Sequence, residues 1–415
     1  MVWSTAPVVL APAPRSTRPV LLRSSSEPGR DRAQPCTVEV VRTAVGLDAL
    51  RPEYDRLHAI SGNTLPFALH EWHVAWWNHF AKTEGKIRDE LRIHVVRDHL
   101  GECVAIVPFV STQREIGYFK TETLGLLGAD PNFTELRWPL VTPGQEKAVA
   151  KAVSRHLRFD DSWDWVQWSG VQGAMGEELA KGGALTWQAP RLDYLVDLAP
   201  TWDAFKGGLK RNIRESLRHC YNSLKRDNLP FEFEVAETPD DVRNALHLFL
   251  SLHSMRAALA NTTHHPNRFE SHTSREFLYE VCDRLAARGV ARVFVLKIRG
   301  CVVAARIGFV VGDQLYLYYS GYDPKWSKYS VPTTVVAEAM KYAIEKGLKA
   351  VNLSTGTDVS KTRWGARLVP FEEAVQAHPR VRSRVTYAAY RSLMDDGGPR
   401  WLGPILKTLP KRAWA

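Results

Sequence analysis

Lys361, Arg363 and Trp364 stand close together in a segment that could carry chemistry. They follow a predicted strand over 350–354 and a turn at Gly356, and loops at strand ends often build the sites of α/β folds. The Lys361 ammonium could neutralise a phosphate or stabilise an oxyanion that develops during a reaction. The structural alternative is a solvated Lys and Arg pair beside a packed Trp.

A second candidate is the segment 329–333, which precedes a predicted helix over 333–346. Ser330 and Thr333 could cap this helix, and the amides of its first turn would then face an anion. Pro332 removes one of those donors. Tyr329, Ser330, Val331 and Thr333 are therefore candidates for holding a phosphate, while an ordinary capped helix with Pro near its start explains the same residues.

A predicted helix over 205–225 carries a cationic face. Lys210, Arg211, Arg214, Arg218 and Lys225 recur at steps near three and four, which places them on one side of a helix. Arg211 and Arg214 could grip a phosphate or a carboxylate, because a guanidinium offers a fork of donors. A solvated helix face is the common alternative for such a run.

A predicted strand over 314–320 is rich in tyrosine. Because side chains alternate along a strand, Tyr316, Tyr318 and Ser320 should share one face, and Leu315, Leu317 and Tyr319 the other. One face should be core, and a tyrosine on the other could act as a general acid. Tyr318 and the nearby Tyr322 are the candidates, although packing is the commoner role of strand tyrosines.

The sequence lacks the motifs that mark several kinds of site. No GxSxG elbow or evident Cys and His pair marks a hydrolase. The five cysteines lack CxxC spacing and a neighbouring His cluster, so neither a zinc site nor a disulfide framework is predicted. His264 and His265 adjoin Pro266 in a predicted loop, and adjacent histidines do not easily aim at one ion. We expect no metal, and the cysteine usage fits a reducing cytoplasm.

The length and net charge of the chain limit the number of its domains and the kinds of partner it can bind. A chain of 415 residues exceeds one ordinary core, so two domains are expected. The formal charge of +10 predicts attraction to phosphate-rich partners. No RNA-binding motif or helix-turn-helix supports nucleic acid as that partner. No apolar run is long enough to span a bilayer, so no transmembrane segment is expected.

The elements that position these residues form two similar halves. Each half places helices before a hairpin whose second strand begins Cys-Val, at Cys103 and Cys301, and each has a later strand ending in Ser and Gly. Aromatic residues at helical spacing over 72–80 predict a helix with a core face. The fold class is α/β (α+β), with a mixed, mostly antiparallel sheet flanked by helices in each half.

The predicted boundaries follow from composition and pattern. Residues 1–36 form a disordered N-terminal tail rich in Pro, Ser and Arg. The N-terminal domain spans 37–200 and closes with a strand over 191–198. The C-terminal domain spans 201–380, and a basic extension covers 381–415.

Four patches of the second half carry a family resemblance: 210–218, the hairpin 293–309, 316–322, and 352–356 followed by 361–365. Their order resembles the acetyltransferase-like family typified by bacterial cellulose-biosynthesis proteins of the CelD type, within the GNAT superfamily. The first half resembles the N-terminal portion of that family at 104–109 and 124–129, so the resemblance covers about 38–376. The tandem arrangement of two GNAT-like halves is also similar to that of Fem-type aminoacyl transferases.

The resemblance implies an N-acyltransferase whose C-terminal half carries the chemistry. Its co-substrate would be acetyl-CoA or another acyl-CoA, and its acceptor an amine or amino sugar of polysaccharide or cell-envelope biosynthesis. Such transfer needs a neutral nucleophile, a held carbonyl and a route for protonating the thiolate. The resemblance implies catalytic roles for Lys361, Tyr318 and Asn352. It implies cofactor binding by Tyr329, Ser330, Val331 and Thr333, and substrate binding by Arg211, Arg214, Tyr322, Arg363 and Trp364.

Two departures from the family pattern leave alternatives open. The segment 328–333 lacks the glycines that usually hold the pyrophosphate, and Asn352 stands where the family often has an acid. One alternative is a degenerate GNAT pair that serves as a binding subunit, associated peripherally with a polysaccharide-producing complex. The other is aminoacyl transfer of the Fem type, from charged transfer RNA.

Overall fold

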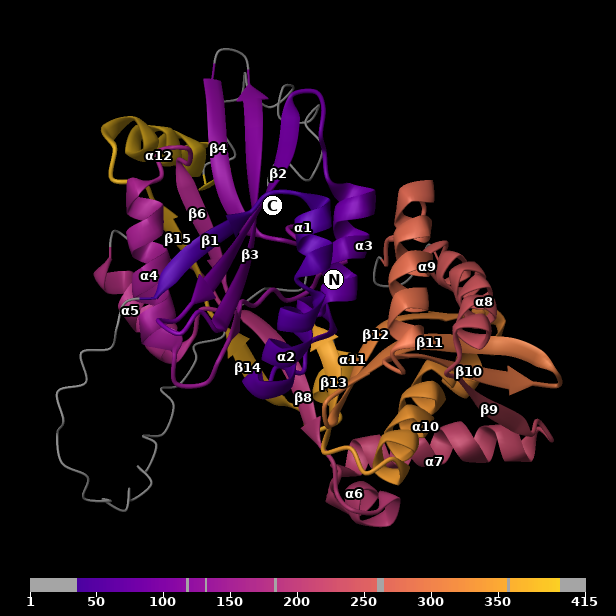
Figure 1. The fold of residues 1–415 in the computed structure, drawn as a ribbon. Coiled ribbons are helices and arrows are strands. Elements are labelled where there is room, and N and C mark those ends of the chain that lie inside the picture. Colours follow the sequence, from indigo (N-terminus) through magenta and orange to yellow (C-terminus); the bar gives the residue numbers. More distant parts are fainter. Residues whose placement is uncertain are drawn as a thin grey trace, which may run out of the picture. The chain divides into compact units, whose positions relative to one another are not determined.

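The computed structural model (Figure 1) describes residues 36–116, 119–130, 133–182, 185–259, 265–356 and 359–395. The predicted tail lies outside these residues except for Cys36, as do His264 and the end of the predicted extension. Two mostly antiparallel sheets flanked by helices confirm the predicted fold class. Of the helices in these ranges, none combines the length and apolar character that a membrane crossing requires.

Among the described residues the first sheet has eight strands. Seven run in the order β1-β2-β3-β4-β6-β15-β7, and β5 pairs with β3. Of the strand pairs within the described ranges of this sheet, only β4 with β6 is parallel. The strands are β1 Thr37–Val41, β2 Ile87–Arg97, β3 Cys103–Ile116, β4 Phe119–Leu126, β5 Leu140–Val141, β6 Trp165–Ser169, β7 Leu185–Trp187 and β15 Glu373–Ala377.

Helices cover both faces of the first sheet. On one face lie α1 (Ala44–Ala49), α2 (Arg51–Ser61), η1 (Pro66–Ala68) and α3 (His70–Phe80), and on the other α4 (Glu146–Phe159) and α5 (Gly173–Lys181). Val95 of β2 packs on the α3 side and Val96 on the α4 side, as strand alternation requires. Trp72 and Trp76 of α3 are almost fully buried, which confirms the predicted core face.

Within the described ranges the second sheet has seven strands, in the order β14-β8-β13-β12-β11-β10-β9. In the described part of this sheet, only the β12–β13 pair is parallel. Arg299 and Gly300, both with positive φ, make the two-residue turn of the β10–β11 hairpin. The strands are β8 Arg191–Asp197, β9 Phe231–Ala236, β10 Ala291–Ile298, β11 Cys301–Val311, β12 Gln314–Tyr322, β13 Ala350–Thr355 and β14 Arg367–Phe371.

The helices of the second half also lie on both faces. α8 (Pro239–Ala257) and α9 (His272–Ala287) cover one face, and α6 (Trp202–Gly208), α7 (Arg211–Arg226) and α10 (Val331–Glu345) the other. The prediction of one helix over 205–225 is wrong, because the backbone is extended at Leu209 and Lys210. Two consecutive glycines, Gly207 and Gly208, favour this break, since glycine loses the most backbone entropy in a helix.

One hydrophobic core joins the two sheets. Trp72 of α3 contacts Phe277 of α9 and Phe309 of β11 edge-on, with ring centroids 5.5 and 5.9 Å apart. Beside them the buried Glu71 of α3 accepts a hydrogen bond from Arg288, which follows α9, at 2.7 Å. The halves are therefore packed and ion-paired through α3 and the end of α9.

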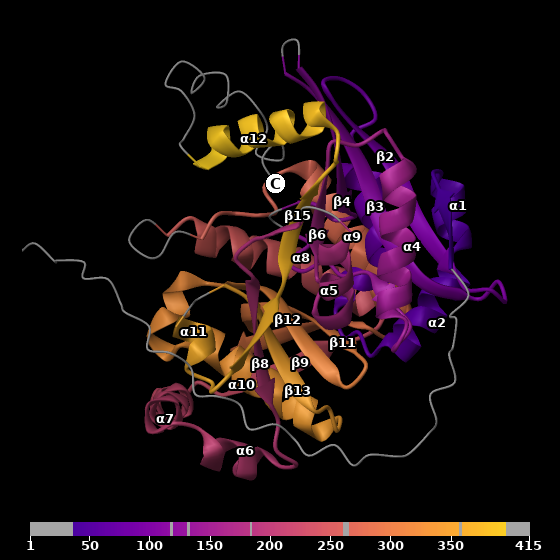
Figure 2. The same cartoon turned by 90° about the vertical axis from the view of Figure 1, so that its left-hand side faces the viewer.

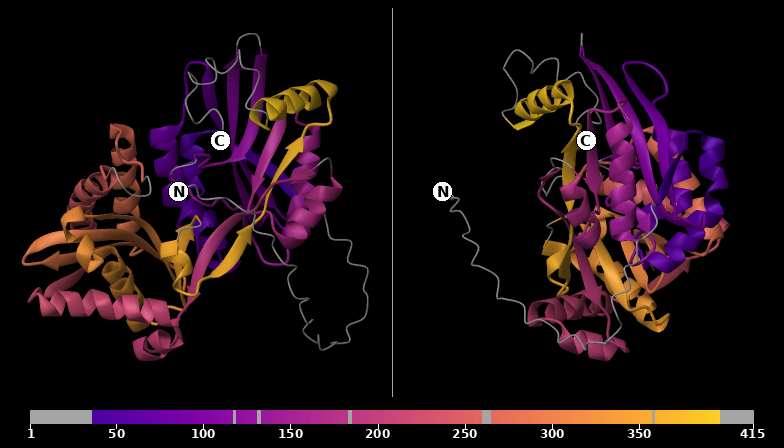
Figure 3. Two further views of the ribbon diagram at one scale, coloured as in Figure 1. Left: turned by 180° about the vertical axis from the view of Figure 1, so that it is seen from behind. Right: turned by 60° about the vertical axis from the view of Figure 1, so that its left-hand side comes forward.

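The two sheets exchange strands. β8, which the sequence assigns to the first half, pairs with β13 and β14 of the second sheet. β15 pairs with β6 and β7 of the first sheet, and Glu372 alone separates it from β14. Figure 2 shows β15 beside β6, and Figure 3 shows the same yellow strand from behind. Boundaries at 200 and 380 thus do not separate the sheets, and the domain limits stay a proposal.

The start of the predicted extension packs on the first half. It forms α12 (Val381–Asp395). Ser383 donates a hydrogen bond to Asp164 at 2.7 Å, and Tyr390 stacks on Trp165 with ring centroids 5.0 Å apart. At least this part of the extension is therefore an element of the fold.

Candidate functional site

β12 and β13 pair over only part of their length. The parallel register joins 314–316 to 350–352, and neither strand pairs with the other beyond it. The 3₁₀ helix η2 (Pro324–Tyr329) leads from β12 to α10, and the short helix α11 (Val359–Thr362) follows β13. The sheet is therefore open toward α10 and α11, at the strand ends where α/β folds often bind ligands.

Six polar side chains meet at this opening, and we call them the polar cluster: Glu135, Asp193, Tyr316, Asn352, Ser354 and Lys361. Lys361 donates hydrogen bonds to the Ser354 hydroxyl at 3.3 Å and to the Thr355 carbonyl. Tyr316 donates to Glu135. Asn352 donates to Asp193 and accepts from the Ser354 amide at 2.7 Å.

The cluster takes its members from both halves of the chain. Glu135 comes from the segment between β4 and β5, and Asp193 from β8. Ser354, in β13, has a φ of 70° although it is not glycine, and it is buried. Strained backbone of this kind persists only where its surroundings hold it, and it concentrates at functional sites.

Burial sets the charge of the two carboxyl groups. Burial raises the pKa of Asp193 to about 6, and the Glu135 charge adds to this effect, while the Asn352 hydrogen bond and the Lys361 charge oppose it. Burial also raises the pKa of Glu135, against the lowering effects of Tyr316 and Lys361. Asp193 is 2% exposed, and its Oδ1 has no hydrogen-bond partner among the described residues. Asp193 can therefore exchange a proton near neutral pH.

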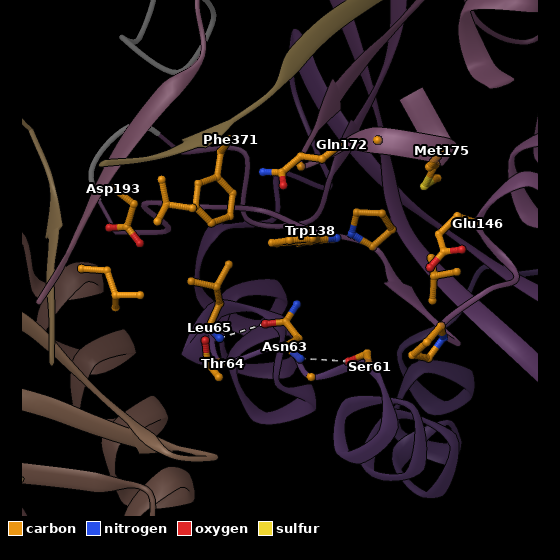
Figure 4. A pocket seen from close by; sticks show the side chains of 18 of the residues that line it. Ser61, Asn63, Thr64, Leu65, Trp138, Glu146, Gln172, Met175, Asp193 and Phe371 are labelled. Carbon is orange, nitrogen blue, oxygen red and sulfur yellow. Dashed lines mark hydrogen bonds between the residues drawn. The ribbon is translucent and has the colours of Figure 1, made fainter. Parts of the chain in front are cut away.

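A cavity of about 660 Å³ opens beside the cluster. Asp193 and Asn352 belong to its wall. Figure 4 shows Asp193, Phe371 and Gln172 along one side and Asn63, Thr64 and Leu65 along the other, with Trp138 between them. Its volume lies within the range of small-molecule sites.

The charges of the cavity wall favour a cationic or neutral ligand. Asp193 and Glu146 supply carboxylates. Arg367 is the one Lys or Arg among the described lining residues, and its guanidinium donates a hydrogen bond to the Asp197 carboxylate at 3.1 Å. Side-chain amides of Asn63, Gln172, Gln314 and Asn352 add uncharged donors and acceptors.

The predicted phosphate segment is only partly arranged for that purpose. Ser330 precedes α10 with a φ of 52° and makes no side-chain cap, so the predicted Ser330 cap is wrong. The amides of Thr333 and Thr334 donate to the Ser330 carbonyl at 2.8 and 3.3 Å. Tyr329 is buried and its hydroxyl donates to Asp227 at 2.8 Å. Val331 is packed in the core.

Arg363 connects α11 to the first turn of α10. Its guanidinium donates to the Thr333 hydroxyl at 2.6 Å and lies over the Trp364 ring, 6.0 Å from the centroid. Trp364 is 2% exposed and packs in the core. The segment that carries Lys361 therefore also places a guanidinium at the start of α10, which brings these two predicted regions together.

The two tyrosine candidates lie outside the polar cluster. Tyr318 is buried, and its hydroxyl donates to the Phe133 carbonyl at 2.7 Å. Its ring packs edge-on against Trp72. Burial raises the pKa of this phenol well above its ordinary value. Tyr322 is half-buried under the guanidinium of Arg256, 6.0 Å from the ring centroid.

The predicted alternation along β12 fails at Tyr319. Tyr319 packs against the same core as Tyr316 and Tyr318, whereas Leu317 packs on the other face. The cause is an irregularity in the β11–β12 ladder, where Arg306 faces Ser320 but Gly308 faces Leu317. One additional β12 residue lies in this step, so two successive side chains turn to the same side.

Arg211 and Arg214 lie in a different place from the polar cluster. Both belong to α7 and line a second cavity together with residues of α6 and α10. Arg211 pairs with Glu215 at 2.7 Å, one turn further along the helix. None of the side chains proposed for substrate binding lines the Asp193 cavity, neither these two nor Tyr322, Arg363 and Trp364.

Four residues of the cluster were not among the site residues predicted from the sequence: Glu135, Asp193, Tyr316 and Ser354. Asp193 lies in the strand segment Leu-Asp-Tyr-Leu-Val, and an acid within an otherwise buried strand is a signal that could have been used. Glu135 lies in a segment without periodic pattern, so only its spatial neighbours reveal it. Within the described ranges, no three His, Cys, Asp or Glu side chains are grouped to hold a metal.

A known family matches part of the second half of the chain. Residues 211–362 match the family described as acetyltransferase (GNAT) domain. No curated protein matches the chain in sequence.

Solved structures share the two-sheet architecture. The crystal structure of FemX is similar with a TM-score of 0.55 and 12% identity, over 78% of this chain and 95% of that one. A conserved protein of unknown function from Bacteroides thetaiotaomicron has a TM-score of 0.50 and 12% identity, over 82% and 100% of the two chains. The C-terminal domain of an assigned lysylphosphatidylglycerol synthetase from Agrobacterium fabrum has a TM-score of 0.50 and 14% identity, over 85% and 97%. Such low identities establish the fold alone. Residues 211–362 thus match the family of acetyltransferase (GNAT) domains, and the described part of the chain has a two-sheet α/β fold similar to that of FemX.

Proposed function

We propose that this protein is an N-acyltransferase whose acceptor amine binds in the Asp193 cavity. The observation that carries the proposal is the Asp193 carboxyl group itself. It lines a cavity, one of its oxygens has no protein partner among the described residues, and its pKa is raised to about 6. A general base works best when its pKa lies near the working pH.

Asn352 stands where the family often has an acidic residue, and we assign the role of that acidic residue to Asp193. Asn352 donates to Asp193 from the adjacent strand. The amide therefore orients the carboxylate instead of acting as the base. We accordingly assign Asn352 a positioning role.

The proposed step forms one C–N bond and breaks the bond between the acyl carbon and its leaving group. The amine nitrogen attacks the carbonyl carbon of the acyl donor, a C–N bond forms, and the nitrogen becomes acidic as it does so. Asp193 accepts that proton, the bond from carbon to the leaving group breaks, and the leaving thiolate recovers the proton from Asp193 or from solvent. Lys361, at the open end of the sheet, would stabilise the negative charge that develops on the carbonyl oxygen.

The donor proposed is acetyl-CoA or another acyl-CoA. Arg363, the Thr333 hydroxyl and the Val331 amide are the groups at the start of α10 that would hold its phosphates. Tyr329 would then act through packing, as would Trp364. The side chain of Tyr318 takes no part in this step, because its hydroxyl is committed to Phe133.

The cavity wall supports an amino sugar as the acceptor. Two carboxylates suit an ammonium group, and the side-chain amides suit hydroxyl groups. Trp138 and Phe371 offer flat apolar surfaces for the ring. Membership of the CelD type and a role in polysaccharide or cell-envelope biosynthesis remain parts of the proposal, supported by the sequence patches. A cytoplasmic location also remains part of the proposal, supported by the cysteine usage.

Aminoacyl transfer of the Fem type is the second candidate. It is favoured because the start of α10 offers few backbone N–H groups to a phosphate. Pro332 has no N–H, and the amides of Thr333 and Thr334 donate to the Ser330 carbonyl. An acyl donor whose phosphates do not bind at the start of α10 would not need these N–H groups. The polar cluster would serve the same chemical step in this case.

The test is amine-dependent release of free thiol from acetyl-CoA, measured with a panel that contains glucosamine and simple alkylamines. Lys361→Ala should lower kcat/KM by about 100-fold or more, the usual cost of removing an oxyanion donor. Lys349→Ala, an exposed lysine directly before β13, is the matched control and should retain full activity. If calorimetry detects no binding of acetyl-CoA to the native chain, the acyl-CoA proposal is wrong, and charged transfer RNA becomes the donor to test.

A further inference from the structure

A second cavity, of about 740 Å³, lies between α6, α7 and α10. Figure 1 shows α6 and α7 below α10, and all three helices pack on the face of the second sheet away from α8 and α9. It shares no lining residue with the Asp193 cavity. It is therefore a distinct site.

Cations from three helices converge on this cavity. They are Lys206 of α6, Arg211, Arg214 and Arg218 of α7, and Lys341 of α10. The acids of its wall are Asp203 and Glu215, so the lining carries an excess of positive charge. Within the described residues, Lys206, Arg214 and Arg218 form no ion pair with an acid.

Lys341 is held in place by its neighbours. Its ammonium lies 5.3 Å from the ring centroid of Trp202 and 4.7 Å from that of Tyr221. It also donates to Glu338 at 2.7 Å, which accepts from the Tyr221 hydroxyl at 2.6 Å. A charge fixed in this way costs little further entropy when it binds a ligand.

The distribution of charge on α7 is unfavourable for the helix alone. No acid stands in its first turn, and Lys210 precedes it without a side-chain cap. Positive side chains at a helix start oppose the helix dipole. Bound anion in the cavity would remove this cost as well as the mutual repulsion of the cations.

We propose that the α6–α7–α10 cavity binds the diphosphate group of a nucleotide-like small molecule. Guanidinium forks of Arg214 and Arg218 suit phosphate oxygens, and the volume suits a ligand of nucleotide size. Lys341 lies ten residues beyond Val331 on α10, which is roughly 15 Å along a helix. The cavity is thus separate from the donor site proposed at the start of α10, and this inference does not depend on the catalytic proposal.

The test is a calorimetric titration of the full chain with ADP at low ionic strength, with pyrophosphate and adenosine as further probes. ADP and pyrophosphate should bind, adenosine should not, and binding should weaken as salt rises. The double variant Arg214→Glu, Arg218→Glu should bind ADP about 100-fold more weakly, since two charge-assisted contacts are lost.

The matched control is the double variant Lys225→Glu, Lys325→Glu, which makes the same change of net charge outside the cavity. Both lysines are exposed and neither lines the cavity. Equal weakening in this control would overturn the proposal, because it would show attraction by net charge alone. Unchanged affinity in the Arg214→Glu, Arg218→Glu variant, with an unchanged circular dichroism spectrum, would also overturn it. So would binding of adenosine as strong as that of ADP.

Discussion

Replacing Asp193 by Asn should make the protein more stable at pH 8. Asp193 is 2% exposed, and burial is the largest cause of its raised pKa. An ionised carboxyl in that place costs free energy of folding. An Asn side chain has nearly the same shape, and its carbonyl can still accept the hydrogen bond from Asn352, so the substitution removes the charge and keeps the contact.

The expected size follows from the pKa. The Asp193 pKa is about 6 in the folded protein against an ordinary value of 3.8, and this difference corresponds to roughly 3 kcal/mol of unfolding free energy. The native protein bears this cost in full above the folded pKa. The cost diminishes as pH falls from about 6 toward 3.8, because the folded state then takes up the proton more readily than the unfolded chain. The advantage of Asp193→Asn should therefore be largest at pH 8 and small near pH 4.

Urea unfolding of both proteins at pH 8, 6 and 4.5 measures this difference. Asp197→Asn is the control on the same strand, since the Asp197 side chain is 66% exposed and pairs with Arg367 at the surface. Its stability should change little at any pH. A lower unfolding free energy of Asp193→Asn at pH 8, or a gain that does not depend on pH, would refute the account of a buried carboxylate whose charge is costly.

With an active acceptor, kcat/KM should rise as pH increases through about 6, because Asp193 is a base only when ionised, and the Asp193→Asn variant should lack this rise. Arg363→Ala should raise the KM for the acyl donor more than it lowers kcat, since the guanidinium lies at the start of α10; a change confined to kcat would contradict its proposed place. Gly321→Ala should destabilise the protein by about 2 kcal/mol or more in thermal unfolding, because the added Cβ would lie 2.4 Å from the backbone nitrogen of His253. Gly207→Ala meets nothing within 4 Å and is its control.

Local patterns predicted those elements whose causes are local. The hairpin of β10 and β11 could be read from apolar runs on either side of Arg299 and Gly300, because two successive residues with positive φ close such a turn. The helical spacing of Trp72 and Trp76 likewise identified α3. In both cases the residues that determine the element lie within it.

Features that depend on distant residues were not predictable in this way. β8 has an ordinary strand pattern, and nothing in it tells that its partners are β13 and β14. The face of β12 on which the Tyr319 side chain lies depends on the register between β12 and β11. The pKa of Asp193 depends on burial between strands that are far apart in sequence.

The strand exchange explains why the candidate site lies where it does. β8 enters the second sheet next to β13, and this places Asp193 against Asn352. The segment between β4 and β5 adds Glu135, which meets Tyr316 of β12. Neither carboxyl group belongs to residues 201–380, so a fragment limited to that range would hold Lys361 without its two acidic neighbours. The second half carries the lysine and the opening of the sheet, and the first part of the chain supplies the carboxylates, so the proposed chemistry requires both.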